Sequence, residues 1–256
     1  MPDLKYFPYC SQLRQYFLIP VAFLSIVLPF FLQAQTTDLD RKSMDIPILT
    51  GDVTINGSLD ESVWAPAVVI EDLHQVLPEE YATPTQPTQV RVFYTENALY
   101  VGATMTESDP DQITDRVLRQ GQALSGDDVF AVILDPYLDR RNGYRFEVNP
   151  NGVRWEGLFQ NITGVEGNWQ GIWEARSERG ENGWTTEIRI PFQSLSFTPG
   201  SSTWGINFNR IRRSDNENIA WMSRNREINP STAGTATGLD GLHQGLGLDV
   251  VPSMTL

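Results

Sequence analysis

The chain has 256 residues, of which 40% are hydrophobic and 11% aromatic, a globular profile large enough for one core. Its 32 acidic and 19 basic residues give a net charge of −13, which argues against a nucleic-acid partner because the phosphate backbone is also negative. Its single cysteine, Cys10, excludes an internal disulfide and zinc sites built on several cysteines.

The N-terminus has the pattern of a secretory signal peptide. Lys5 and Arg14 precede an apolar run from Phe17 to Leu32, and Ala34 supplies a small residue for cleavage. The alternative, a membrane anchor, fits less well because the run is shorter than about 20 residues and contains two prolines. We therefore expect residues 1–34 to be removed and the protein to be exported.

Residues 35–51 are polar, with little periodicity, and indicate a leader strand or linker. Strand patterns begin after Asp52. Alternating apolar residues in 89–95 and again in 99–105, separated by a short polar turn, predict a β-hairpin. Residues 127–135 are apolar on both faces between carboxylates, which is typical of a central strand covered on both sides.

A second hairpin is predicted around the turn Asn149-Pro150-Asn151-Gly152. Before the turn, apolar residues at 144, 146 and 148 alternate with Arg145, Glu147 and Asn149, and the alternation resumes at Val153 and Trp155. Further strands are predicted over 172–177, 184–190 and 204–208, with short helical turns near 61–65 and 109–113.

Many short strands joined by Gly, Asn and Pro turns predict an all-β fold, an antiparallel β-sandwich of the jelly-roll type. We expect this domain to span residues 52–240. Residues 241–256 are Gly-rich at first and then alternate from Leu246, as in the start of a truncated C-terminal region.

Several stretches together resemble the family 9 carbohydrate-binding modules. They are Asn56 to Trp64, the hairpin through Val90 and Tyr100, Asp127 to Asp135, Gly183 to Phe192, and Trp204 to Phe208. The segment Gly143 to Gly152 is most similar to the branch in which such a domain precedes an outer-membrane β-barrel. The resemblance implies an oligo- or polysaccharide partner, a barrel in a longer parent chain, and a place in the periplasm, outer membrane or cell surface of a Gram-negative-type envelope.

A sugar site needs an aromatic plane for stacking and polar groups for the hydroxyls. Trp155, Trp169 and Trp173 are the predicted stacking residues, with Arg154 and Glu156 beside them in the sequence. An equally open alternative is that these tryptophans pack in the core. Three other tryptophans begin apolar strand faces or follow a turn, and we expect them in the core: Trp64, Trp184 and Trp204.

Three carboxylates, Asp127, Asp128 and Asp135, can supply oxygen ligands to calcium. The resemblance supports this cofactor, because relatives in the family hold calcium structurally. The competing interpretation is that these side chains cap turns and pair with nearby arginines, namely Arg140, Arg141 or Arg145.

The sequence favours binding over catalysis. Glycosidases need two facing carboxylates, but Glu156, Glu174 and Glu187 occupy alternating positions that fit the solvent faces of strands. The first hypothesis is an exported carbohydrate-binding domain, accessory to polysaccharide binding or catabolism at the cell envelope. The alternatives are a non-sugar-binding interaction domain of a barrel protein and a glycoside hydrolase. The basic stretch Arg210 to Arg213 either balances local acids or contacts acidic sugars.

Overall fold

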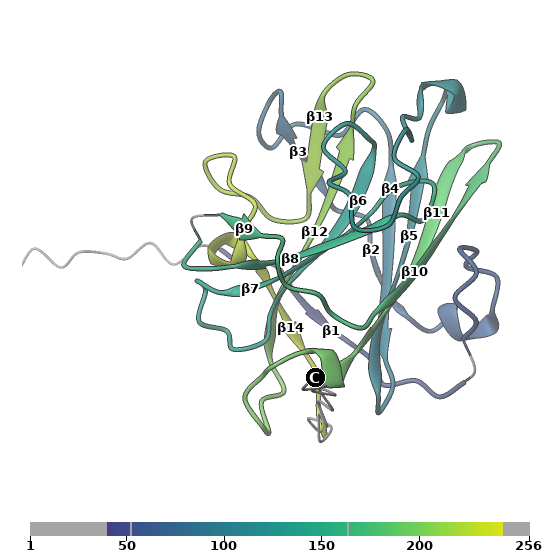
Figure 1. The fold of residues 1–256 in the computed structure, drawn as a ribbon. Helices are drawn as coiled ribbons and strands as arrows, with labels where there is room; N and C mark the ends of the chain where they lie inside the picture. The colour runs from purple at the N-terminus through teal and green to yellow at the C-terminus, as the bar shows by residue number, and fades with distance from the viewer. Residues whose placement is uncertain (1–39, 52, 163, 243–256) are drawn as a thin grey trace, which may run out of the picture. The chain divides into compact units, whose positions relative to one another are not determined.

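The computed structural model describes residues 40–51, 53–162 and 164–242, which form two facing β-sheets (Figure 1). The larger, nine-stranded sheet has a main path in the order β1 (Ser43–Asp45), β14 (Gly234–Thr237), β12 (Trp204–Arg212), β6 (Val129–Asp135), β7 (Gly143–Val148), β8 (Arg154–Phe159) and β9 (Val165–Glu166). Beside this path, β13 (Glu217–Ala220) pairs with β12 and with β3 (His74–Leu77).

The smaller, five-stranded sheet has the order β10 (Glu174–Gly180), β11 (Gly183–Pro191), β5 (Ala98–Thr106), β4 (Thr88–Tyr94) and β2 (Val68–Ile70). Short 3-10 helices connect the strands: η1 (Ser62–Trp64), η2 (Pro110–Gln112), η3 (Phe192–Ser194) and η4 (Pro230–Thr232). The antiparallel β-sandwich expected from the sequence is therefore confirmed.

The two predicted hairpins are confirmed as β4 with β5 and β7 with β8. The strands predicted over 172–177 and 184–190 correspond to β10 and β11, which pair with each other. The predicted central strand is β6, which lies between β12 and β7 and is buried at every position. The leader segment contributes β1, which pairs with β14 in parallel. The strand expected from Leu246 and the signal peptide expected over 1–34 lie outside the described residues.

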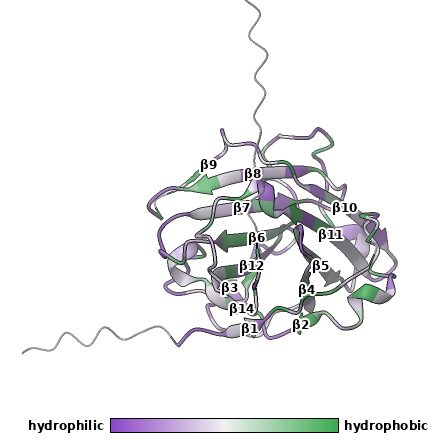
Figure 2. Ribbon diagram, turned by 90° about the horizontal axis from the view of Figure 1, so that it is seen from below, coloured by the Kyte–Doolittle hydropathy of each residue, from purple (hydrophilic) through white to green (hydrophobic). Residues whose placement is uncertain are grey.

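The main core fills the space between the sheets, and Figure 2 shows hydrophobic residues concentrated on β6. The exposed fractions of Trp64, Trp184 and Trp204 are 2%, 2% and 1%, which confirms the expectation that these tryptophans are core residues. Among the residues that the structure describes, no helix is long and apolar enough to cross a membrane.

The stretch from Asn56 to Trp64 covers the outer face of the smaller sheet and is fixed there by Glu187. The carboxylate of Glu187 accepts hydrogen bonds from Asn56 N at 2.8 Å, Gly57 N at 2.9 Å and Trp64 Nε1 at 3.0 Å. Burial raises the pKa of Glu187, although these three bonds oppose the shift. The prediction that Glu187 lies on a solvent face is wrong, because the Asn56 to Trp64 segment covers it.

Candidate functional site

The hairpin of β7 and β8 sends the predicted sugar-binding residues to two different sides of the larger sheet. Along β8, Arg154 and Glu156 lie opposite Val148 and Phe146, which belong to the main core. Trp155 lies opposite Glu147 and so points to the outer face. The five predicted residues therefore do not form one site.

On the inner side, Trp173 contacts both Arg154 and Glu156. The guanidinium carbon of Arg154 lies 5.3 Å from the centroid of the Trp173 ring, and Trp173 Nε1 donates to Glu156 Oε2 at 3.2 Å. Trp173 is only 3% exposed and packs edge-on against Phe146 at 5.1 Å between ring centroids. In this structure Trp173 is a core residue, because its ring has little surface left for a ligand.

Trp169 is half-buried and lies over the core at the same end of the sandwich. Its ring centroid is 5.0 Å from that of Tyr144 and 5.9 Å from that of Phe146. These contacts use its ring for packing between the loop before β10 and the inner face of β7. Of the predicted stacking residues, Trp155 is the one on the outer face.

On the outer face, one cross-strand row brings an aromatic ring, a carboxylate and an amide together. The register pairs Trp155 with Glu147, Glu147 with Ala131, and Ala131 with Asn209, so these residues of β8, β7, β6 and β12 share a face. Ala131 is the small member of the row, and the side chains on either side of it can approach one another.

Arg145, two residues before Glu147 on the same face, links this row. Its Nε donates to Glu147 Oε1 at 2.5 Å, and its Nη2 donates to Asn209 Oδ1 at 2.9 Å. Within the described residues, Oε2 of Glu147 takes part in no hydrogen bond. The row therefore offers a carboxylate oxygen and a guanidinium beside an indole ring, a set suited to hydroxyl groups. Asn209 is 2% exposed, and its amide, which also donates to Ile219 O at 2.9 Å, supports the guanidinium from below.

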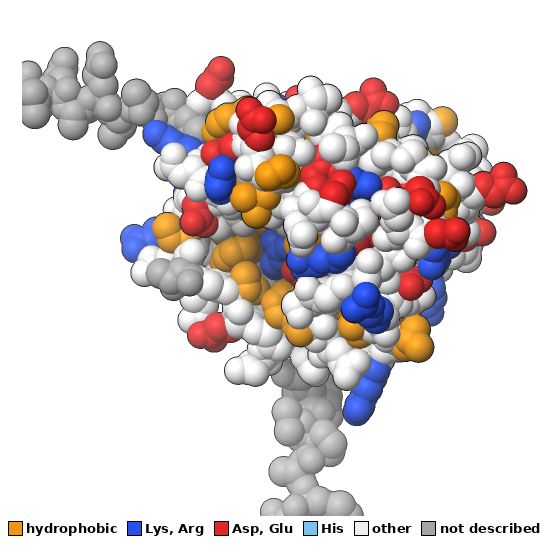
Figure 3. All heavy atoms as spheres, turned by 90° about the horizontal axis from the view of Figure 1, so that it is seen from above, with side chains coloured by type: hydrophobic (Ala, Val, Ile, Leu, Met, Phe, Trp, Pro, Cys, Tyr) orange, Lys and Arg blue, Asp and Glu red, His pale blue; other side chains and the backbone are white. Residues whose placement is uncertain are grey.

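The indole ring of Trp155 lies against glycines. A Cβ atom placed on Gly157 would be 2.9 Å from Trp155 Cη2, and one placed on Gly167 would be 3.0 Å from Cζ2. Trp155 and Val117 both pack against the outer-face cluster that contains Leu124, from the segment before β6. From above, the surface on the side of the larger sheet is hollowed, and hydrophobic and basic side chains gather there (Figure 3).

The wall formed by residues 114–124 is held by Asp127 and Asn149. Asp127 Oδ2 accepts from Val117 N at 2.9 Å and from Asn149 Nδ2 at 2.8 Å, while the same amide donates to Val117 O at 2.9 Å. Gln120 Oε1 then accepts from Arg154 N at 2.8 Å, at the start of β8. The Asn-Pro-Asn-Gly turn thus anchors the wall beside Trp155.

The three carboxylates predicted for calcium do not fit one metal site. Asp127 and Asp128 directly precede β6, whereas Asp135 ends it, and the two oxygens of Asp135 accept from the backbone N–H groups of Asp139 and Arg140. Both oxygens of Asp127 accept backbone N–H groups as well. In residues 40–242, apart from the two undescribed positions, no three His, Cys, Asp or Glu side chains gather as metal ligands.

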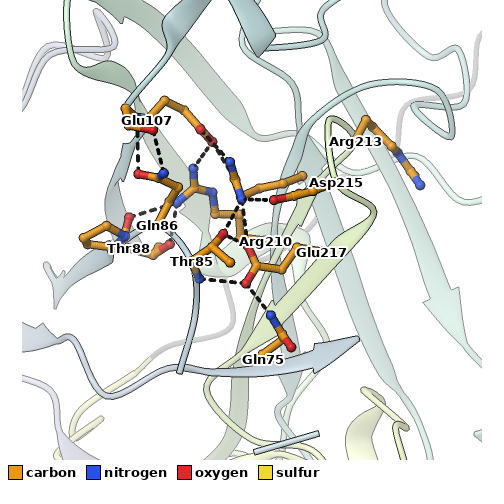
Figure 4. Close-up of polar contacts among 12 residues, drawn as sticks. Gln75, Thr85, Gln86, Thr88, Glu107, Arg210, Arg213, Asp215 and Glu217 are labelled. Carbon is orange, nitrogen blue, oxygen red and sulfur yellow. Dashed lines mark hydrogen bonds and ion pairs between the residues drawn. The ribbon is translucent and has the colours of Figure 1, made fainter. Parts of the chain in front are cut away.

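The basic stretch on β12 is part of a buried ion network (Figure 4). Glu107 pairs with Arg210 at 2.5 Å and with Arg212 at 2.7 Å, and Arg212 also pairs with Glu217 at 2.8 Å. Arg210 and Arg212 are 1% and 3% exposed, so neither is available to an acidic sugar. The structure agrees with the other interpretation of this stretch, in which the arginines balance nearby acidic residues. Arg213 points away from the network (Figure 4).

Asp128 lies next to this network and is 2% exposed. Burial raises its pKa to about 6, with the Glu107 charge adding to the shift and the hydrogen bond from Arg213 N opposing it. Hydrogen bonds from Thr85, Gln75 and Arg212 instead keep the pKa of Glu217 low, although burial acts in the other direction. Of these two buried carboxylates, Asp128 is therefore the one that titrates near neutral pH.

A second hollow, of about 570 Å³, is lined by residues that include Glu96, Asn97, Arg189 and Gln193. The aromatic residue in its lining, Phe192, is 1% exposed and packs in the main core. This hollow has polar groups but no aromatic plane, and so it suits a sugar ring less well than the surface around Trp155.

Sequence reasoning found Trp155 but missed Arg145, Glu147 and Asn209 as site residues. For the first two a signal was present, because the alternation in β7 and the length of the turn put them on the Trp155 side of the hairpin. No local signal brings Asn209 near, since β12 reaches this face through a long-range pairing with β6.

An open sheet face with an aromatic ring and hydrogen-bonding side chains is the arrangement of a ligand-binding β-sandwich. A sequence profile of the family described as "Carbohydrate family 9 binding domain-like" matches residues 55–237. The chain belongs to this family. No curated protein sequence matches the chain.

Solved structures agree with this assignment at the level of the fold. A family 9 carbohydrate-binding module from Caldicellulosiruptor kristjanssonii, in complex with cellotriose, is 20% identical with a TM-score of 0.55, covering 84% of this chain and 100% of that one. A structure of a family 9 module from the same organism in complex with glucose is also 20% identical, with a TM-score of 0.55, and the match covers 77% of this chain and 95% of that one. A candidate carbohydrate-binding protein from Bacteroides uniformis is 15% identical, with a TM-score of 0.58, and the match covers 77% of this chain and 99% of that one.

Proposed function

We propose that this domain binds carbohydrate on the outer face of the nine-stranded sheet. Trp155 supplies the stacking plane, Glu147 and Arg145 bind hydroxyl groups, and the buried Asn209 holds the guanidinium of Arg145 in place. The observation that carries the proposal is the cross-strand row that puts a half-buried indole directly beside a carboxylate linked to a guanidinium. Membership of the family and the sugars bound by the Caldicellulosiruptor module support it.

The test is calorimetric titration of the purified chain with glucose, cellotriose, xylo- and manno-oligosaccharides and uronates. Trp155→Ala removes the stacking plane, and Glu147→Gln removes a charged acceptor, so each is expected to weaken binding about tenfold or more. Trp173→Phe is the matched control, since Trp173 belongs to the inner group of predicted residues.

The two groups of residues predict opposite results. If Trp173→Phe abolishes binding while Trp155→Ala leaves it unchanged, the site lies on the inner side and the outer-face proposal is wrong. If a folded protein binds none of the sugars, the function is better described as that of a non-sugar-binding interaction domain. Release of sugar from polymeric substrates would instead identify a glycoside hydrolase.

We also propose that the domain is exported and acts at the cell envelope in polysaccharide binding or catabolism. Support comes from the N-terminal pattern of Lys5, Arg14 and the apolar run to Leu32. The resemblance of Gly143 to Gly152 supports a place beside an outer-membrane β-barrel. Cell fractionation and N-terminal sequencing of the exported protein test this: recovery in the cytoplasm with Met1 intact would contradict it.

Calcium binding remains a prediction from the resemblance. Because Asp127, Asp128 and Asp135 do not share one site, none of the proposed sugar contacts requires a bound calcium ion. Titration of the EDTA-treated chain with calcium, followed by thermal unfolding, tests it. A saturable rise in the melting temperature supports a structural ion, and an unchanged melting temperature speaks against one.

A further inference from the structure

The loop after β9 determines how the stacking ring of Trp155 lies. Gly167 follows β9, and the three atoms nearest to a Cβ placed there all belong to Trp155: Cζ2 at 3.0 Å, Cε2 at 3.3 Å and Nε1 at 3.3 Å. Contacts of 3.0 to 3.4 Å are tighter than carbon atoms accept in close packing, so the indole would have to shift.

Gly157 gives the ring its second contact. A Cβ there would lie 2.9 Å from Trp155 Cη2, but it would also meet Val165 at 2.6 Å and the backbone oxygen of Glu166 at 2.9 Å. Substitution of Gly157 would therefore disturb the pairing of β8 with β9 as well as the ring. At Gly167, by contrast, the three nearest atoms all belong to the ring of Trp155.

No backbone requirement explains a glycine at position 167. Glycines whose φ lies in the left-handed region include Gly152, Gly183 and Gly200, and Gly167 is not among them. An alanine is therefore compatible with the backbone at this position. What the missing side chain provides is room for the benzene and pyrrole edges of Trp155.

We propose that Gly167 is a positioning residue for the sugar site, which sets the tilt of the Trp155 ring and with it the affinity for the stacked sugar. This inference rests on the proposed function of the outer face. Stacking depends on the distance and angle between the ring and the sugar, and the polar groups that bind the hydroxyls, Arg145 and Glu147, stay fixed on β7. If the ring tilts, the sugar can no longer stack on it and keep its hydrogen bonds to these polar groups at the same time.

The experiment compares Gly167→Ala with Gly164→Ala in the full chain, using the sugar that the wild-type protein binds best. Gly164 lies three positions earlier, directly before β9, and a Cβ there would meet nothing within 4 Å. Gly167→Ala is expected to weaken binding about threefold to tenfold and Gly167→Val to weaken it further, whereas Gly164→Ala binds like the wild type. All variants should keep the wild-type melting temperature within a few degrees.

A double-mutant cycle with Trp155→Ala separates positioning from a general structural effect. If Gly167 acts through the ring, Gly167→Ala has no further effect on affinity once the ring is absent. Wild-type affinity in Gly167→Ala, or an equal loss in the Trp155→Ala background, overturns the inference while the sugar site stands. Wild-type affinity in Trp155→Ala itself overturns the proposed site and the inference together.

Discussion

Asp128 makes the stability of this domain depend on pH in a direction opposite to that of an ion-paired carboxylate. Its pKa rises from the ordinary value of 3.8 to about 6, because its side chain is buried. The folded state therefore binds a proton more readily than the unfolded chain between these pH values. The free energy of unfolding thus rises as pH falls from about 6 towards 3.8, and the full cost of the buried charge is present above pH 6.

The size of the effect follows from the shift. At about 1.4 kcal/mol per pKa unit, ionisation of Asp128 costs about 3 kcal/mol of stability at pH 7.5 and roughly half as much at pH 5. Asp128→Asn removes the charge and keeps an oxygen that can accept from Arg213 N, now 2.8 Å from Asp128 Oδ1. We expect this variant to be more stable than the wild type by up to those amounts.

Urea unfolding of both proteins at pH 7.5, 6 and 5 measures the difference in unfolding free energy. Asp139→Asn is the control of opposite sign, because hydrogen bonds from Asn142 and Arg141 lower the pKa of this exposed carboxyl. That variant should be less stable than the wild type at pH 7.5. The reasoning is refuted if Asp128→Asn is less stable than the wild type, or if the difference in unfolding free energy between the two proteins does not decrease towards pH 5.

Two further stability predictions concern burial and packing. Arg212→Ala leaves the buried carboxylates of Glu107 and Glu217 without their shared cation, so we expect a loss of about 3–5 kcal/mol in urea unfolding. Arg213→Ala, outside the network, should change little, and an equal loss in both would contradict the assignment. Gly102→Ala would put a Cβ 2.4 Å from Leu59 and 2.9 Å from Trp64, costing about 1–3 kcal/mol, whereas Gly126→Ala meets nothing within 4 Å and should be neutral.

The polar members of the proposed site show how far local pattern extends. Alternation in β7 separates Arg145 and Glu147 from the core residues between and beside them, and the turn after Asn149 sets the register that places Glu147 opposite Trp155. Both facts can be obtained by counting along the sequence. The third polar residue, Asn209, cannot, because its strand pairs with β6 across more than 70 residues of chain.

Glu187, Arg210 and Arg212 show where the same reasoning fails. Glu187 alternates with core residues and therefore looks like a solvent-facing residue. Arg210 and Arg212 look like surface cations because of their charge, although they continue the apolar face of Phe208. A strand pattern reports which residues share a face, but it does not report what covers that face. The segment Asn56 to Trp64 buries Glu187, and Glu107 and Glu217 enclose the two arginines.

The sequence by itself determined the all-β class, the hairpins, the core tryptophans and the family resemblance, because period-two alternation and turn residues are local properties. The tertiary structure alone decided which of the predicted site residues meet: Trp155 faces outwards with Glu147, while Arg154, Glu156 and Trp173 meet on the inner side. The physical reason is that neighbouring residues on a strand point to opposite faces. Adjacent positions in the sequence therefore become opposite surfaces of the sheet, and each surface takes its partners from distant strands.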